Sequence, residues 1–246
     1  LLAAAARRGG LVAAGHTERF NPAVAAAIPL ITAPRFIEIH RLGTFPERSL
    51  DIDVVFDLMI HDLDLLLAVV GSRVESIEAV GVNVLTPRTD IANVRLRFAS
   101  GCIANLTASR ISRERVRKAR FFQPQAYVSI DYAAQEVEVY RIEPHPSTTA
   151  RPSVPLARRH AQGVLSSSKD GTAQSLPQGR TALSIVEGQE GRPVIQGGRL
   201  EIVNEEPLKR ELADFVEAVR TGRQPGVTGS AGREALALAT RIAELM

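Results

Sequence analysis

The chain has 246 residues and a formal net charge of +3; 45% of its residues are apolar, 23% are charged and 4% are aromatic. These proportions are ordinary for a globular protein and exclude a coiled coil, a collagen-like repeat and a wholly disordered chain. No run of about 18 apolar residues occurs, so we expect no membrane-spanning helix. The single cysteine, Cys102, excludes a disulfide framework and a four-thiolate zinc site, and we expect it to be buried. Nothing in the sequence calls for an oxidising compartment, and we expect a cytoplasmic protein.

The basic balance of the chain does not indicate a nucleic-acid partner. The sequence pI is about 9.4, but 30 basic residues face 27 acidic ones, and only three of the basic residues are lysines. One cluster, residues 110–120, holds six basic residues with no aromatic side chain among them and no glycine-rich or zinc-finger pattern. We therefore expect no binding to nucleic acid.

The first residues have the pattern of the end of a larger unit. Leu1 to Arg8 predicts a helix that ends at Gly9-Gly10, with arginines near its negative end. Leu11 to Ala14 predicts a short buried strand, and the polar sequence GHTERFNP follows at residues 15–22. This order is typical of the closing unit of a parallel α/β domain. Because the helix has neither an initiator methionine nor an N-cap, we expect it to begin upstream.

The rest of the chain predicts helices on either side of a run of strands. A short helix (22–28), an alternating strand (35–42) and a long helix (50–70) that stops at Gly71 come first. Period-two alternation then predicts an antiparallel meander with strands at 74–85, 91–98, 102–110, 116–122, 126–132 and 137–142. Residues 144–180 have the composition of a flexible insertion. Two strands (182–186 and 200–203) and two helices (207–220 and 229–246) are expected to complete the chain.

The predicted helix 50–70 carries an acidic stripe with one histidine. Asp53, Asp57, His61 and Asp64 recur at spacings of four, four and three, which places them on one helix face. That face meets either solvent or a polar cleft. It carries no lysine or arginine, and its histidine lies one turn from a carboxylate, which is the arrangement that orients an imidazole as a general base. Both features favour a cleft.

A metal site is the alternative use of the same helix. His61, Asp62 and Asp64 could serve a metal-dependent hydrolase as hard ligands. Adjacent helical residues, however, diverge by about 100° and do not easily share one ion. The chain also lacks the spacings of two histidines, or of glutamate and histidine, that typical helical metal sites use. We therefore expect no metal.

Taken together, these motifs resemble the Gfo/Idh/MocA family of NAD(P)-dependent sugar oxidoreductases. The resemblance rests on GHTERFNP at 15–22, on DLMIHDLDLL at 57–66, on the meander and on the closing helices. It implies an α+β fold with a large open, mostly antiparallel sheet and helices on one face, preceded by a remnant of a Rossmann domain. Residues 1–22 would then close a dinucleotide-binding domain, and residues 23–246 would form a substrate-binding and oligomerisation domain.

The resemblance also implies the site residues. Asp57 and His61 would be the catalytic pair, with His61 as acid/base. His16 would lie at the cofactor, and Arg19 and Asn21 would lie beside the substrate. The cofactor would be NAD or NADP, and its main site is expected upstream of Leu1, because the chain contains no G-x-G-x-x-G fingerprint and no Glu-Lys-Pro motif. The chain alone is expected to be inactive.

Within the family, the resemblance favours a nucleotide sugar, with a UDP-N-acetylhexosamine such as UDP-N-acetylglucosamine oxidised at its 3-hydroxyl. Arg41 and Arg48 flank the loop before the long helix, so with Arg19 they could bind a diphosphate as substrate-binding residues. Surface pairing of Arg41 and Arg48 with neighbouring carboxylates is the alternative. The expected partners are a small-molecule substrate and further copies of the chain, which would form a homo-oligomer through the open sheet face. A non-catalytic protein that keeps only the interaction domain is the rival function.

Overall fold

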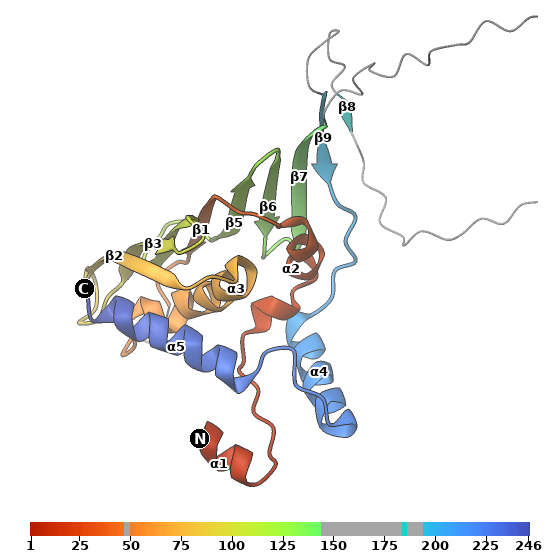
Figure 1. Ribbon diagram of the computed structural model, residues 1–246. Coiled ribbons are helices and arrows are strands. Elements are labelled where there is room, and N and C mark those ends of the chain that lie inside the picture. The colour runs from red at the N-terminus through yellow and green to blue at the C-terminus, as the bar shows by residue number, and fades with distance from the viewer. Residues whose placement is uncertain (47–49, 144–183, 186–193) are drawn as a thin grey trace, which may run out of the picture.

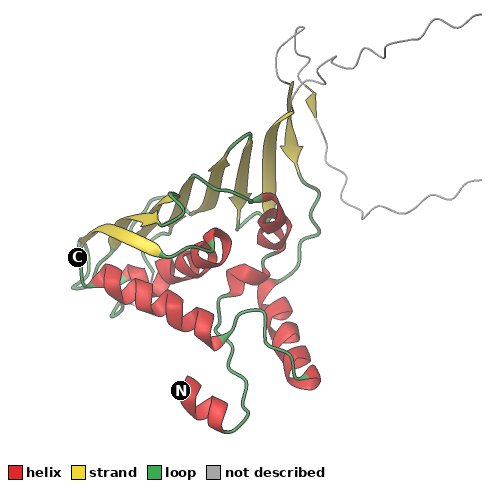
Figure 2. Ribbon diagram, in the orientation of Figure 1, coloured by secondary structure: helices red, strands yellow, loops and turns green. Residues whose placement is uncertain are grey.

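The computed structural model describes residues 1–46, 50–143, 184–185 and 194–246. The insertion expected at 144–180 and the predicted substrate ligand Arg48 lie outside the described residues. The described strands form one nine-stranded sheet in the order β2-β3-β4-β1-β5-β6-β7-β9-β8. The helices gather on one face of this sheet (Figure 1), and the strands form a continuous layer behind them (Figure 2). The expected α+β fold with an open, mostly antiparallel sheet is confirmed.

The strands of the sheet follow the predicted alternation but not a simple meander. Their bounds are β1 Phe36–Leu42, β2 Val74–Val82, β3 Ile91–Phe98, β4 Ile103–Ser109, β5 Val116–Gln123, β6 Ala126–Asp131, β7 Glu136–Glu143, β8 Ser184–Ile185 and β9 Val194–Arg199. The first strand of the chain, β1, lies in the middle of the sheet, parallel to β4 and antiparallel to β5. The expectation of six consecutively paired strands was therefore wrong at this point. The prediction of a strand at 200–203 was also wrong, because the strand that pairs with β7 is β9, which ends at Arg199.

The central strands bury one face and leave the other more exposed, as expected for a sheet covered on one side. In β3, Ala92, Val94, Leu96 and Phe98 are fully buried, and the residues between them are exposed or half-buried. The open face instead carries paired charges, such as Arg120 with Glu38 at 3.5 Å. This one-sided pattern places the core between the sheet and the helices.

The helices lie before, within and after this sheet. Their bounds are α1 Leu2–Arg7, α2 Pro22–Ala27, α3 Ile60–Val70, α4 Pro207–Thr221 and α5 Gly229–Ala243, and the shorter turns are η1 Thr17–Phe20, η2 Ile28–Leu30 and η3 Val55–Met59. The predicted helix 50–70 begins later than expected. Its first turn, η3, is a π-helix that runs directly into α3, and α3 ends at Gly71 with φ +58°. The left-handed conformation explains why glycine stands there.

Asp53 is not part of the helix that it was predicted to join. Its carboxylate accepts a hydrogen bond from the backbone N–H of Thr89 at 2.9 Å, 36 residues further along the chain. The acidic stripe is therefore shorter than predicted and begins at Asp57.

The N-terminal segment packs against the start of α5. The strand predicted at 11–14 is reduced to a single antiparallel bridge between Ala13 and Thr228. Gly232 makes this approach possible, because a Cβ atom at that position would clash with the Cβ of Ala14. Consequently the position of the following residues, 15–22, is set in part by α5.

Candidate functional site

The motif GHTERFNP is a junction at which several elements meet. Its 3₁₀ turn η1 and the flanking residues are bonded to four other parts of the fold. Thr17 donates to Glu211 of α4 at 2.7 Å, Glu18 pairs with Arg41 of β1 at 3.0 Å, and Arg19 pairs with Asp64 of α3 at 3.4 Å. Asn21 caps α2 by accepting from Ala23 at 3.0 Å and also donates to the carbonyl of Tyr132 at 3.0 Å. Contacts within the fold therefore account for the polar side chains of the motif.

Arg41 is the buried centre of this junction. Its Nε and Nη2 atoms donate to the two carboxylate oxygens of Asp62, both at 2.8 Å. Its Nη1 atom bonds Glu18, and its guanidinium lies 5.5 Å from the centre of the Tyr132 ring. Burial opposes the charge of Arg41, but the two carboxylates outweigh burial and raise its pKa above the usual value. For Arg41 the alternative of surface pairing was wrong, because Arg41 is itself buried and its partners are the buried Asp62 and the half-buried Glu18.

His61 is held at the same junction by a second histidine. The Nδ1 atoms of His16 and His61 are 3.2 Å apart, and the rings meet edge-on at 81°. Burial lowers the pKa of His61 below its usual value of 6.5, and the charges of Arg41 and His16 lower it further, against the opposing carboxylates of Asp62 and Glu18. His61 is therefore a neutral imidazole at neutral pH, which is the form that accepts a proton.

These side chains border a cavity of about 490 Å³. It is lined by Thr17, Glu18, Asn21, Arg41, Asp57, Leu58, His61, Arg117, Tyr132, Gln135 and residues 206–208. The structure therefore brings together four of the predicted site residues: Asp57, His61, Asn21 and Arg41. Arg19 does not line the cavity, because it reaches the buried Asp64 instead, and His16 lies directly behind His61.

The described residues do not assemble the alternative metal site. Asp62 is held by Arg41 and Asp64 by Arg19, and no group of three or more possible metal ligands occurs within the described ranges. Burial raises the pKa of Asp64, and the charges of Arg19 and His16 oppose that rise. The stripe therefore has two parts: Asp57 and His61 border the cavity, while Asp64 is buried at an ion pair.

Comparison with known proteins agrees with the fold and the motifs. The model of the Gfo/Idh/MocA C-terminal domain matches residues 36–129. The chain is 31% identical over 243 residues, or 98% of its length, to a UDP-N-acetylglucosamine 3-dehydrogenase of Acidithiobacillus ferrooxidans. Residues 36–129 are therefore similar to the C-terminal domain of Gfo/Idh/MocA proteins, and almost the whole chain is similar to this dehydrogenase. It spans 64% of the length of that relative, which is less than two thirds.

Two solved structures have a similar architecture. A structure of the UDP-N-acetylglucosamine 3-dehydrogenase from Acidithiobacillus ferrooxidans matches all of this chain and 65% of its own, with a TM-score of 0.77 and 29% identity. An aldose-aldose oxidoreductase from Caulobacter crescentus matches 99% of this chain and 65% of its own, with a TM-score of 0.67 and 17% identity. The second likeness concerns the fold alone.

Glu18, Tyr132 and Arg117 are among the cavity residues that the sequence reasoning missed. Glu18 stood inside a motif whose other polar residues were singled out, and as the only carboxylate there it was a natural partner for an arginine. Tyr132 follows β6 and is 4% exposed, with a buried hydroxyl that forms no hydrogen bond to the described residues. Arg117 was counted only within the basic cluster. Burial raises the pKa of Tyr132 well above its usual value of 10, so its hydroxyl stays protonated.

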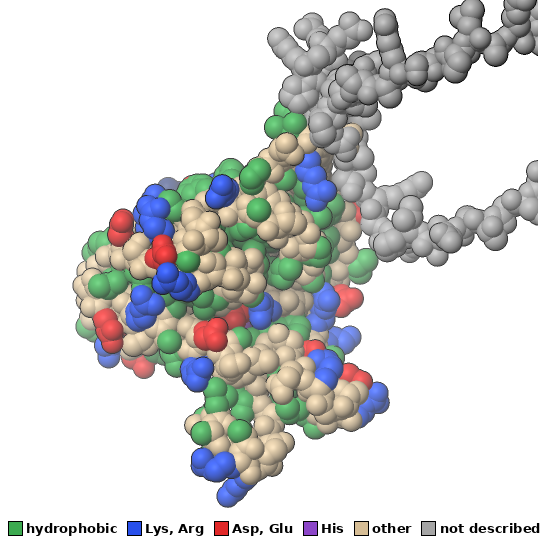
Figure 3. Space-filling model, viewed as in Figure 1, with side chains coloured by type: hydrophobic (Ala, Val, Ile, Leu, Met, Phe, Trp, Pro, Cys, Tyr) green, Lys and Arg blue, Asp and Glu red, His purple; other side chains and the backbone are tan. Residues whose placement is uncertain are grey.

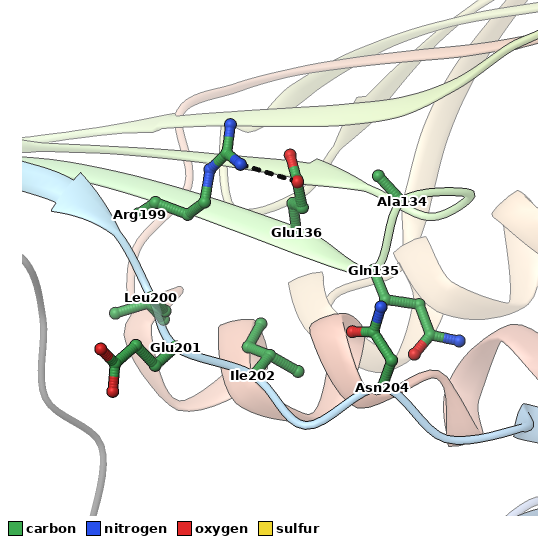
Figure 4. Close-up of a pocket in the computed structure, with 8 residues that line it drawn as sticks. All are labelled: Ala134, Gln135, Glu136, Arg199, Leu200, Glu201, Ile202 and Asn204. Carbon is green, nitrogen blue, oxygen red and sulfur yellow. Dashed lines mark hydrogen bonds and ion pairs between the residues drawn. The ribbon is translucent and has the colours of Figure 1, made fainter.

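A second cavity, whose lining residues are drawn in Figure 4, has Gln135 in common with the first. It measures about 400 Å³ and is lined by residues 134–136, residues 199–202 and Asn204. Gln135, which borders both cavities, bonds the backbone of Glu205 twice, donating to its carbonyl at 2.8 Å and accepting from its N–H at 3.1 Å. The β6–β7 turn thereby fixes the chain just before α4, whose first residues line the main cavity.

Three of the six basic residues in the cluster 110–120 form ion pairs within the fold. Arg110 is 1% exposed, lies 3.6 Å from Asp90 and bonds the carbonyls of Ile52 and Thr89. Lys118 pairs with Asp131 at 3.3 Å, and Arg120 pairs with Glu38. On the face drawn in Figure 3, charges of both signs are interspersed with apolar side chains. No helix in the described parts of the chain is both long and apolar enough to cross a membrane.

Proposed function

We propose that the chain is the substrate-binding part of an NAD(P)-dependent oxidoreductase that transfers a hydride between a secondary hydroxyl of a sugar and the cofactor. The observation that carries the proposal is the position of His61. It is an imidazole with a lowered pKa, one helical turn from Asp57, at the border of a polar cavity. Oxidation of a secondary alcohol requires a base for the hydroxyl proton as the hydride leaves, and His61 meets that need at neutral pH. Asp57 would bind an adjacent hydroxyl or orient the substrate.

Family dehydrogenases generally use NAD(P), which supplies the hydride acceptor. The described residues do not fit the cofactor's pyrophosphate. The glycine-rich start of α5 resembles a phosphate-binding turn, but a Cβ atom at Gly229 would already crowd Leu2 and Val12. We therefore place the main cofactor site in a domain ahead of Leu1, of which residues 1–22 would be the closing part, with His16 at the junction of the two domains.

The proposed substrate is a nucleotide sugar, with UDP-N-acetylglucosamine as the leading candidate. The name of the relative from Acidithiobacillus ferrooxidans supports this choice. So does Arg117, which lines the cavity and whose side chain forms no hydrogen bond or ion pair with the described residues. Arg41 and Arg19 are engaged by carboxylates, so Arg117 is the cation best placed to meet a diphosphate, and Arg41 would act by holding the cavity wall.

A homo-oligomer through the open sheet face also forms part of the proposal. Cross-strand aromatic pairs lie on this face, with Phe36 against Phe122 at 5.6 Å and Phe122 against Tyr127 at 5.1 Å between ring centres. Helices cover the other face, so a second copy is the partner that would bury these rings. Light scattering that finds a monomer would contradict it.

The test is a substrate panel on the enzyme that includes the cofactor domain, monitored by nicotinamide absorbance. We expect a UDP-sugar to be turned over faster than free glucose or inositol. His61→Ala should lower kcat by about 100-fold or more, the usual scale for a lost general base, whereas His40→Ala, on the open face of β1, should not. A loss below threefold at His61 would remove it from the chemistry.

The role of Arg117 has a separate readout. Arg117→Gln should raise KM for the UDP-sugar by about tenfold or more, the scale of a lost charge-assisted hydrogen bond, and should change KM for an uncharged sugar little. Arg113→Gln, at an exposed residue outside the cavity lining, is the matched control. An equal rise in KM for both substrates would show that Arg117 only supports the cavity wall.

A further inference from the structure

The contact between His16 and His61 constrains where a proton can sit. The two Nδ1 atoms face one another at 3.2 Å, and a hydrogen bond between two imidazole nitrogens requires one donor and one acceptor. If neither nitrogen carried a proton, two lone pairs would face each other, and if both did, two N–H groups would collide. One proton is therefore shared between the two Nδ1 atoms.

The position of the cavity indicates which of the two rings donates the shared proton. The Nδ1 atom of His61 is occupied by His16, so Nε2 is the nitrogen left to meet a substrate hydroxyl. A base must have a free lone pair, so Nε2 carries no proton and Nδ1 does. His61 is then the donor and His16 the acceptor, with the proton of His16 on its own Nε2 atom.

His16 is held firmly enough to act as such an acceptor. It is 6% exposed. Its backbone N–H donates to Ala14 at 2.9 Å, and its carbonyl accepts from Arg19 at 3.0 Å. Its Nε2 atom faces the start of α5, 4.0 Å from where a Cβ atom of Gly232 would lie. The backbone of His16 is therefore held by hydrogen bonds, and its ring lies between His61 and the start of α5.

We propose that His16 is a positioning residue: its Nδ1 atom accepts the Nδ1–H of His61 and so holds His61 in the tautomer whose free Nε2 atom meets the cavity. The sharing of one proton between the rings follows from their contact, whereas the assignment of His61 as its donor rests on the proposed function, in which Nε2 is the base. In a Ser-His-Asp triad a carboxylate occupies this position and stabilises the imidazolium. His16 fixes the same tautomer without adding a negative charge.

The neutral acceptor has a consequence for the strength of the base. The charged groups around the pair come from η1, β1, α3, η3, β5 and α5, and they are Glu18, Arg19, Arg41, Asp62, Asp64, Asp57, Arg117 and Arg233. The first five are engaged in ion pairs with one another, and Arg233 shares an apolar cavity with His16. A carboxylate in place of His16 would be the nearest negative charge to His61 and would raise its pKa.

The experiment is histidine nitrogen NMR on the chain labelled with ¹⁵N, which reports tautomers and titration without any enzyme activity. In the wild type, His61 should be the Nδ1–H tautomer. His16→Asn should preserve it, because the side-chain oxygen of asparagine takes the place of Nδ1. His16→Leu should give a mixture of tautomers. His16→Asp should raise the pKa of His61 by about one pH unit or more, the scale of a close opposite charge.

His40, on the open sheet face, serves as the internal reference and should not change in any variant. The proposal is overturned if His61 has the same tautomer and titration in the leucine and aspartate variants as in the wild type. If the leucine variant does not fold, the aspartate variant alone decides, and an unchanged titration of His61 in it overturns the proposal. In the active enzyme, His16→Asp should also shift the pH profile of kcat/KM upward. If no sugar is oxidised while the NMR result stands, the proposed function fails and the positioning role survives.

Discussion

Removing the carboxylate of Asp62 tests the claim that a buried ion pair holds the cavity wall. Asp62 is 2% exposed and Arg41 is 4% exposed, and two hydrogen bonds of 2.8 Å join them. Asp62→Asn leaves the guanidinium buried with one remaining carboxylate, Glu18. Loss of one partner of a buried pair costs about 3–5 kcal/mol. Since Glu18 still compensates part of the charge, we expect about 3 kcal/mol.

Urea denaturation followed by circular dichroism measures this loss. A decrease of about 3 kcal/mol should lower the midpoint by about 1 M or more without changing the slope. The double variant Arg41→Met, Asp62→Leu removes both charges, and it should recover most of the stability because no uncompensated ion remains. Glu136→Gln is the control. It breaks an exposed pair with Arg199 at 2.7 Å and should cost less than about 1 kcal/mol.

Two results would refute the reasoning. One is a loss at Asp62 no larger than the loss at Glu136. The other is a double variant as unstable as the single one, which would mean that the shape of the two side chains, and not their charge, holds η1, β1 and α3 together.

Three further predictions follow from burial and close packing. Folding lowers the pKa of His61, so as the pH drops the unfolded chain binds this proton first. The free energy of unfolding should therefore fall below about pH 6.5. In urea titrations at a series of pH values, His61→Gln should reduce this dependence of stability on pH. Burial raises the pKa of the Cys102 thiol to about 11, so at pH 8 it should react with a thiol reagent only after unfolding; rapid labelling of the folded chain would contradict this. Gly232→Ala should lower the unfolding free energy by about 1–3 kcal/mol through its clash with Ala14, whereas Gly10→Ala, which meets only ordinary contacts, should change it by less than about 0.5 kcal/mol.

Local patterns were sufficient to predict much of the sheet. The alternation of β3 and the glycine that ends α3 are properties of neighbouring residues, and both were visible in the sequence. The place of β1 was not, because its pairing with β4 joins residues that lie more than 60 positions apart. The same limit applies to Asp53, whose spacing fits the helix but whose partner is Thr89.

One feature of the sequence could have predicted part of the site but was not used. Ile37, Ile39 and Arg41 alternate along β1, and the structure buries all three. An arginine in register with two isoleucines on a buried face requires carboxylate partners. That argument leads to Asp62 and Glu18. The proximity of Asp57 and His61 was predicted from their spacing, whereas Tyr132 and Arg117 reach the cavity only through the folded sheet.

The π-helical turn at Val55–Met59 makes the number of residues in this turn important for the site. Such turns accommodate one residue more than an α-helix does and often occur at functional sites. Deleting one residue between Asp57 and His61 would rotate one side chain relative to the other by about 100° around the helix axis. In an alignment of relatives, a single gap in this turn would therefore mark a protein that keeps both residues and loses their shared cavity. Insertions and deletions here are as informative as substitutions.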